Sequence, residues 1–71
     1  MTDEQINNIF TYHAPTDHQK TRYENLRGSA KMLASLINTY CPESREKSLA
    51  LTNLQQAIMW ANASIAINEK P

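Results

Sequence analysis

The chain reverses direction at the stretch Tyr40-Cys41-Pro42-Glu43 (residues 40–43), which separates two long segments of helical periodicity. Cys41 precedes a proline, and the residue before a proline avoids helical backbone geometry, so the first segment ends there. Pro42 suits the first position of a new helix, where a backbone N–H has no partner to lose. Because the connection is short, the two helices are expected to lie antiparallel as a helical hairpin.

The segment before the turn predicts a helix over residues 17–40. Thr16 and Gln19 have the spacing of a capping box, which marks the start of a helix. Apolar residues then recur three and four positions apart, as in a coiled-coil seam: Tyr23, Leu26, Ala30, Leu33, Ile37 and Tyr40. Gly28 interrupts this segment, and such a glycine is either tolerated or marks close approach of a backbone or ligand.

The segment after the turn predicts a helix over residues 43–68. One apolar row consists of Leu51, Leu54, Ile58, Ala61 and Ile65, and a second of Leu49, Trp60, Ala63 and Ile67. A face this broad exceeds what one partner helix covers. The 71 residues contain a single cysteine, so no internal disulfide supports the fold. Small chains without such support usually oligomerise. We therefore predict an all-α homo-oligomer whose subunit is one helical domain over residues 1–71.

Residues 1–16 are predicted to form an N-terminal arm. Thr2 and Gln5 again have capping-box spacing, which favours a short helix over residues 1–9, with a mobile terminus as the alternative. The run Phe10-Thr11-Tyr12-His13-Ala14-Pro15 follows and has no place in either long helix. Aromatic residues on such an arm either cap the core of a neighbouring subunit or stack on a base.

The amino-acid composition excludes some classes of binding partner. Seven basic and seven acidic side chains balance, whereas proteins that bind a DNA or RNA duplex usually carry a basic excess. The chain lacks the apolar run of about 18 residues that a membrane helix needs and lacks a signal-peptide pattern. We expect a soluble protein that is not exported, with no membrane and no nucleic-acid duplex as partner.

The residues that could bind a ligand lie mainly in the first long segment. Arg27 and Lys31 are one helical turn apart and could together hold phosphate oxygens. The alternative is a solvated face on which Glu24 pairs with Arg27. Ser29 adds a hydroxyl beside Gly28 on the same stretch, although such a serine is more often an indifferent small helix residue than a ligand contact. Asn62, on the second helix, needs a hydrogen-bond partner across the oligomer or on a ligand.

Neither a metal site nor a catalytic site is predicted. His13, His18 and Asp17 lack a further ligand at supporting spacing. Glu43 and Glu46 resemble one half of a magnesium-binding acidic set, but they are better explained by the positive end of a helix. We therefore expect no enzymatic activity, no cofactor and no metal.

Several sequence blocks together resemble a family, the anti-CBASS cyclic-oligonucleotide sponges of bacteriophages. The resemblance covers residues 10–66 and is carried by Phe10-Thr11-Tyr12-His13-x-Pro15, Arg22-Tyr23-Glu24-x-Leu26-Arg27, Ala30-Lys31-x-Leu33-Ala34, Cys41-Pro42-x-Ser44-x-Glu46 and Met59-Trp60-Ala61-Asn62-Ala63. It implies a compact helical homohexamer that sequesters cyclic dinucleotides such as 3′,3′-cGAMP without cleaving them, in the cytoplasm of the infected bacterium. Effectors of the antiphage pathway are thereby deprived of their messenger.

The resemblance also implies roles for particular residues. Tyr12 would stack on a base, and Arg27 would contact the phosphates of a cyclic dinucleotide held between two subunits. Ser29 matches a position of the separate cyclic-trinucleotide pocket, where Ile67 departs from the basic residue expected nearby. The predicted ligand-binding set is Tyr12, His13, Arg27, Gly28, Ser29 and Lys31. Two alternatives remain: an oligomeric protein-binding module with no nucleotide ligand, and a small nucleotide hydrolase.

Overall fold

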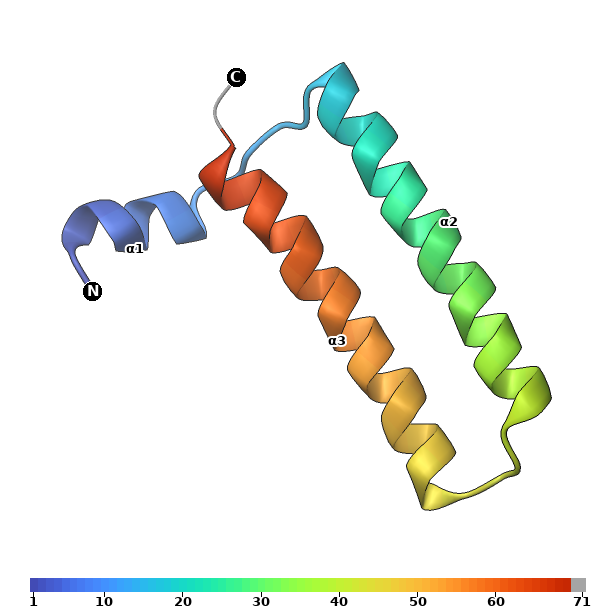
Figure 1. Cartoon of the computed structure of the whole chain (residues 1–71). Helices are drawn as coiled ribbons and strands as arrows, with labels where there is room; N and C mark the ends of the chain where they lie inside the picture. Colours follow the sequence, from blue (N-terminus) through green and yellow to red (C-terminus); the bar gives the residue numbers. More distant parts are fainter. Residues whose placement is uncertain (70–71) are drawn as a thin grey trace.

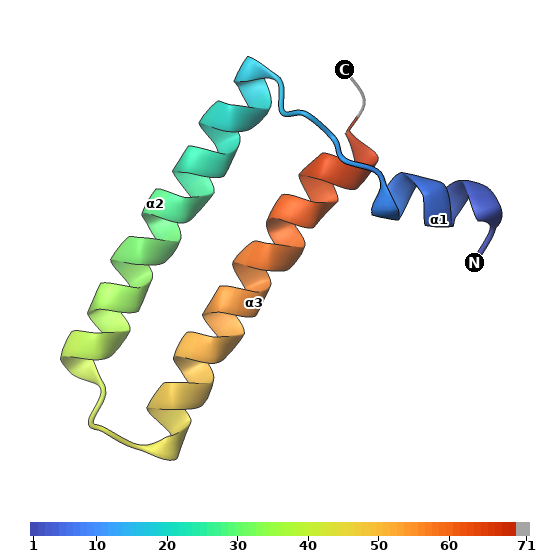
Figure 2. The ribbon, with the colours of Figure 1, turned by 180° about the vertical axis from the view of Figure 1, so that it is seen from behind.

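Two long antiparallel helices lie side by side, and a short third helix projects from the end where the chain finishes (Figures 1 and 2). The computed structural model describes residues 1–69, so residues 70 and 71 of the predicted domain lie outside the described residues. The elements are α1 (Asp3–Phe10), α2 (Asp17–Tyr40) and α3 (Arg45–Asn68). The predicted all-α hairpin with a short N-terminal helix is confirmed.

Side-chain caps set the starts of the first two helices. The Thr2 hydroxyl accepts a hydrogen bond from the backbone N–H of Gln5 at 3.1 Å. In return, the Gln5 side-chain oxygen accepts one from the backbone N–H of Thr2 at 2.8 Å. Thr16 and Gln19 form the same capping box at the start of α2, which has the predicted bounds. Such caps satisfy backbone donors that a helix start leaves without partners.

The second long helix begins two residues later than predicted. Ser44 is its N-cap and accepts from the backbone N–H of Lys47 at 3.1 Å, so α3 starts at Arg45 rather than at residue 43. A serine hydroxyl satisfies an exposed helix donor, which a proline at the first position cannot do. Glu43 lies before the helix, where its carboxylate accepts from the Lys47 ammonium at 2.6 Å.

The extended part of the N-terminal arm (residues 1–16) is shorter than predicted. Phe10 is the last residue of α1, not the first residue of an extended arm, because the capped helix continues through it. One hydrogen bond holds the arm to the hairpin, and a second lies within the arm. The Asn8 amide donates to the backbone carbonyl of Ile67 at 3.0 Å, and the His13 ring Nε2 lies 2.6 Å from the carbonyl of Asn8. The α1 helix is therefore tied to the end of α3, and the extended part of the arm is tied to α1.

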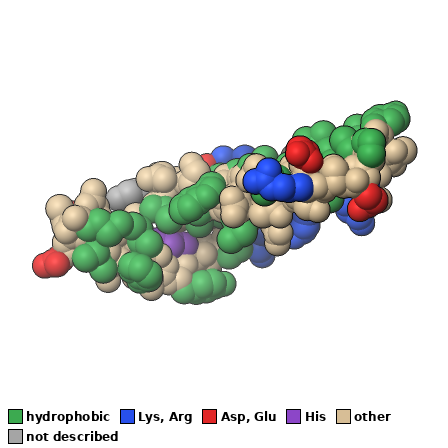
Figure 3. Space-filling view, turned by 90° about the horizontal axis from the view of Figure 1, so that it is seen from below, with side chains coloured by type: hydrophobic (Ala, Val, Ile, Leu, Met, Phe, Trp, Pro, Cys, Tyr) green, Lys and Arg blue, Asp and Glu red, His purple; other side chains and the backbone are tan. Residues whose placement is uncertain are grey.

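The hairpin encloses no apolar core. Within residues 1–69 no hydrophobic side chain is buried, and the two buried residues are the polar Gln19 and Lys47. The molecule measures 45 × 29 × 13 Å, so it is a single layer about one helix thick. Trp60 is 75% exposed, and Figure 3 shows hydrophobic side chains spread over the surface.

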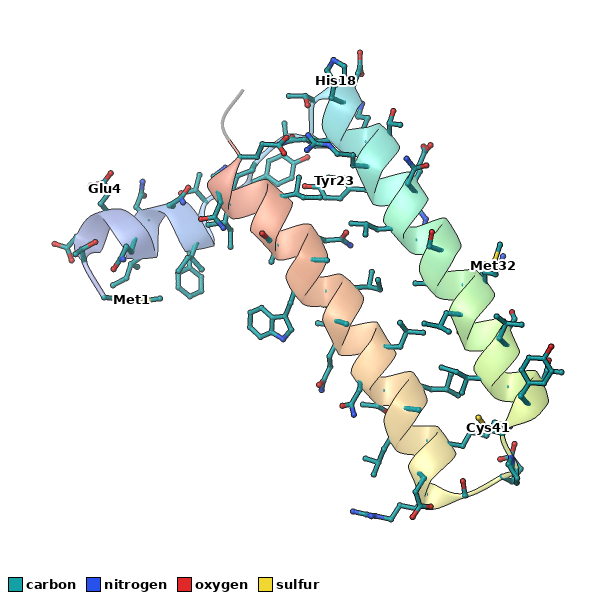
Figure 4. The ribbon with its side chains drawn as sticks, in the orientation of Figure 1. Met1, Glu4, His18, Tyr23, Met32 and Cys41 are labelled. Carbon is teal, nitrogen blue, oxygen red and sulfur yellow. The ribbon has the colours of Figure 1, made fainter. Side chains whose placement is uncertain are left out.

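The predicted apolar seam is only partly formed. Its central members on α2 and α3 are half-buried against one another, whereas Leu33 and Tyr40 are exposed. Met32 points away from α3 (Figure 4). Because α2 meets a single neighbouring helix, only one narrow strip of its apolar face finds cover within the chain.

Candidate functional site

A groove of about 420 Å³ runs between the two long helices on one face of the layer. We call it the central groove. Its walls are formed by Arg27, Ala30, Lys31 and Ala34 from α2 and by Leu51, Leu54, Gln55, Ile58, Met59 and Asn62 from α3. The volume lies in the range of small-molecule sites, and an apolar floor with a few polar groups is typical of them.

A second hollow of about 400 Å³ adjoins the central groove toward the open end of the hairpin. We call it the Tyr23 hollow. Tyr23 and Arg27 line it from α2, and Asn62, Ala63 and Ala66 line it from α3. Arg27 and Asn62 line both cavities, so they stand where the two meet.

Arg27 and Lys31 bring two cations to this face. They are one turn apart on α2, and both side chains line the central groove. The ion pairs among residues 1–69 are Arg22 with Glu69 and Lys47 with Glu43. The alternative pairing of Glu24 with Arg27 is therefore not formed. Two positive charges without a protein partner beside a concave surface favour an anionic ligand.

Asn62 carries an unsatisfied polar atom at the junction of the two cavities. Its side-chain oxygen Oδ1 is enclosed by protein and receives no hydrogen bond from residues 1–69. Most buried polar atoms in folded proteins have a partner, so each exception asks for an explanation. Asn62 was predicted to need a partner beyond its own hairpin, and this geometry agrees with that prediction.

Ser29 lies on the other face of the layer. Two residues along a helix correspond to a rotation of about 200°, so Ser29 and Arg27 point in nearly opposite directions. A separate groove of about 360 Å³ contains Ser29 and is completed by Arg22, Asn25, Leu26 and Ile65. The structure thus does not bring Ser29 together with Arg27.

The cation beside Ser29 is already paired. The Arg22 guanidinium donates two hydrogen bonds to the Glu69 carboxylate. The bond from Arg22 lowers the pKa of Glu69, and the bond to Glu69 raises the pKa of Arg22. Arg22 therefore offers this groove far less net positive charge than Arg27 offers the central groove.

The remaining predicted residues lie outside the two cavities that contain Arg27. Tyr12 is 84% exposed on the arm and lines neither of these two cavities. His13 is half-buried and lines a separate hollow of about 550 Å³ beside α1. A Cβ atom added to Gly28 would meet nothing within 4 Å, so the hairpin itself imposes no need for glycine. Within a single chain, these three residues are not assembled with Arg27.

Sequence reasoning missed two features of the site region. The sequence places Tyr23 in the apolar seam, and in the structure it also lines a hollow beside Arg27 and Asn62; Figure 4 shows it between α2 and α3. Lys47 was not singled out, although it is buried at the hairpin turn. No spacing rule would have found either, because each depends on how α2 and α3 are aligned.

Two other features are absent from residues 1–69. These residues contain no cluster of three or more His, Cys, Asp or Glu side chains that could hold a metal ion. None of the described helices combines the length and apolar character that crossing a membrane requires.

Comparison with known proteins identifies one family. The family described as Acb2/Tad1, hairpin domain, matches residues 2–66 of the chain. No curated protein sequence and no solved structure gives a significant match. The match begins within the N-terminal arm and ends near the end of α3, so it includes both cavities that Arg27 lines.

Proposed function

We propose, from the premise that the chain belongs to the anti-CBASS sponge family of Acb2 and Tad1, that it binds cyclic dinucleotides and sequesters them without cleavage. In this proposal a phage makes the protein in the cytoplasm of its bacterial host, and CBASS effectors are deprived of their messenger. A cyclic dinucleotide such as 3′,3′-cGAMP is the ligand. The family is one of binding proteins rather than of enzymes.

One observation carries the proposal. Arg27 and Lys31 bring two cations without protein partners to a groove that also has an apolar floor. A cyclic dinucleotide carries two phosphates and two flat bases, so it needs both kinds of surface. A balanced overall charge is no obstacle, because a few converging cations suffice for a small anion.

The absence of an enclosed core supports assembly into an oligomer. Large apolar side chains, including Met32, Met59 and Trp60, stay exposed on the described hairpin. Water contact with that much apolar surface is costly, and burial between copies relieves it. We propose a homohexamer, in which the arm bearing Tyr12 and His13 reaches the groove of a neighbouring subunit. Gly28 would allow close approach there.

The ligand would lie between two subunits. Tyr12 of one chain then stacks on a base, while Arg27 side chains from both chains hold the phosphates. Stacking on an aromatic ring contributes about 1–3 kcal/mol per base. Ser29 would belong to a second pocket on the opposite face for cyclic trinucleotides. In that pocket Glu69 neutralises Arg22, and Ile67 supplies no charge, so binding is expected to be weak.

Isothermal titration with 3′,3′-cGAMP tests the proposal directly. The expected result is saturable nanomolar binding, about −12 kcal/mol, at one ligand per two subunits. Ligand recovered intact after denaturing the complex would exclude the hydrolase alternative. A protein that assembles but releases no heat with any cyclic dinucleotide would instead favour the protein-binding module.

Site variants refine the test. Arg27→Ala should weaken binding by at least about 30-fold, because truncating one member of a buried charge pair costs about 2 kcal/mol or more. Tyr12→Ala should weaken it about tenfold through lost stacking. Arg45→Ala is the matched control, since Arg45 lies at the first turn of α3 beside the hairpin turn. If both site variants bind like the parent, the assignment of these residues is wrong.

A further inference from the structure

We infer that Asn62 reads the amino group of a nucleobase, and that the Tyr23 hollow is the base subsite in which it does so. This inference rests on the proposed function and makes it more specific. It assigns a specificity-determining residue and the class of base that the residue selects.

The side-chain oxygen of Asn62 is enclosed by protein. Oδ1 is a hydrogen-bond acceptor that no donor among residues 1–69 reaches. A buried acceptor without a hydrogen bond destabilises the free protein by its desolvation cost. A ligand that supplies a donor removes this cost, so binding of that ligand is favoured by the same free energy. The terminal torsion of asparagine is soft, and a rotation about it turns the oxygen toward either neighbouring cavity.

Asn62 stands with Arg27 where the two cavities meet. These two residues are shared by the central groove and the Tyr23 hollow. A ligand whose phosphate contacts the Arg27 guanidinium therefore places its adjoining atoms within the reach of the Asn62 amide. A ligand that satisfies both groups carries a phosphate and an N–H donor.

The walls of the Tyr23 hollow suit a flat ring. Ala63 and Ala66 have small side chains, so a flat ring can approach the surface of α3 closely. Tyr23 supplies an aromatic wall on the opposite side. This combination of aromatic wall, small-residue floor and amide edge fits a planar base better than it fits a sugar or a peptide.

Asparagine recognises adenine through two hydrogen bonds. Its Oδ1 accepts from the exocyclic N6 amino group, while its Nδ2 donates to the ring nitrogen N7. Hypoxanthine carries a carbonyl oxygen in place of that amino group, so Asn62 Oδ1 would face another acceptor. The protein should therefore prefer adenine to hypoxanthine at this subsite.

Two cyclic dinucleotides and one variant test the inference. Titration of the parent protein with 3′,3′-cyclic di-AMP and 3′,3′-cyclic di-IMP should show at least about tenfold tighter binding of the former. Asn62→Leu, close in volume but without an acceptor, should lose about tenfold for cyclic di-AMP. It should change cyclic di-IMP much less, because there the lost bond to N7 is offset by the lost repulsion between Oδ1 and the carbonyl oxygen of the base. Asn53→Leu is the matched control, since Asn53 is exposed on α3 and lines neither the central groove nor the Tyr23 hollow.

Each outcome decides between distinct conclusions. Equal affinity of the parent for both ligands overturns the inference even if Asn62→Leu does not fold. Equal losses for both ligands in Asn62→Leu overturn it as well, because Asn62 would then act on the assembly. A parent that binds no cyclic dinucleotide overturns the proposed function and this inference together. A higher melting temperature for Asn62→Leu, with weaker binding of cyclic di-AMP, supports the inference, because a purely structural residue would not show opposite effects.

Discussion

Replacing Lys47 by methionine should destabilise the hairpin by about 2 kcal/mol. The Lys47 side chain is only 6% exposed, and its ammonium donates to the backbone carbonyl of Asn38 at 3.1 Å. Asn38 lies in the last turn of α2, where a carbonyl finds no donor within the helix. Lys47 therefore joins the end of α2 to the first turn of α3.

The magnitude follows from the two contacts of the Lys47 ammonium, with the Asn38 carbonyl and with the Glu43 carboxylate. A hydrogen bond from a charged donor contributes about 1.5–3 kcal/mol. The pair with Glu43 adds about 0–1 kcal/mol, because that carboxylate is 89% exposed and is screened by water. Methionine keeps an unbranched stem of similar length, so the packing is largely preserved. For a chain of this size, 2 kcal/mol corresponds to a fall of about 8–16 °C in melting temperature.

The assay is urea unfolding followed by circular dichroism at one fixed protein concentration, since the stability of an oligomer depends on concentration. Glu43→Gln is the control and should cost less than about 1 kcal/mol. The reasoning would be refuted if Lys47→Met unfolded within about 0.5 kcal/mol of the parent. It would also be refuted if Glu43→Gln cost as much as Lys47→Met.

Two further predictions concern α2. The hydrogen bond from Arg22 lowers the pKa of Glu69, so its stabilising effect is present above the usual glutamate pKa of about 4.3 and is lost as the pH falls through the lowered value. As the pH falls through this range, the free energy of unfolding should therefore decrease less for Glu69→Gln than for the parent. Equal decreases would contradict the prediction. Gly28→Ala should raise the stability of the helix by about 1 kcal/mol, because the new methyl group meets no atom of the hairpin. If thermal unfolding shows the gain but titration shows weaker ligand binding, Gly28 is needed for close approach by a neighbouring subunit or the ligand.

The helices were predictable because their signals are local. The capping box of Thr16 and Gln19 and the break before Pro42 act within a few residues, so they set α2 without reference to the rest of the chain. The start of α3 was misplaced because Pro42 and Ser44 compete as start signals two residues apart. The hydroxyl of Ser44 prevailed by satisfying a backbone donor.

The cations of the candidate site were also predictable, but their surroundings were not. One helical turn of spacing is enough to put Arg27 and Lys31 on the same face. Whether that face is hollow depends on the side chains that α3 presents to it. Those side chains include Asn62, which is 35 residues away from Arg27 along the chain.

The sequence by itself determined an all-α hairpin with too little apolar cover, since periodicity and caps are properties of short segments. Only the tertiary structure decided that Arg27 and Asn62 meet at the junction of two cavities and that Ser29 faces the other way. The physical reason is the alignment of α2 against α3. The turn and the Lys47 contact set that alignment, and a shift of one residue would rotate a different set of side chains into the groove.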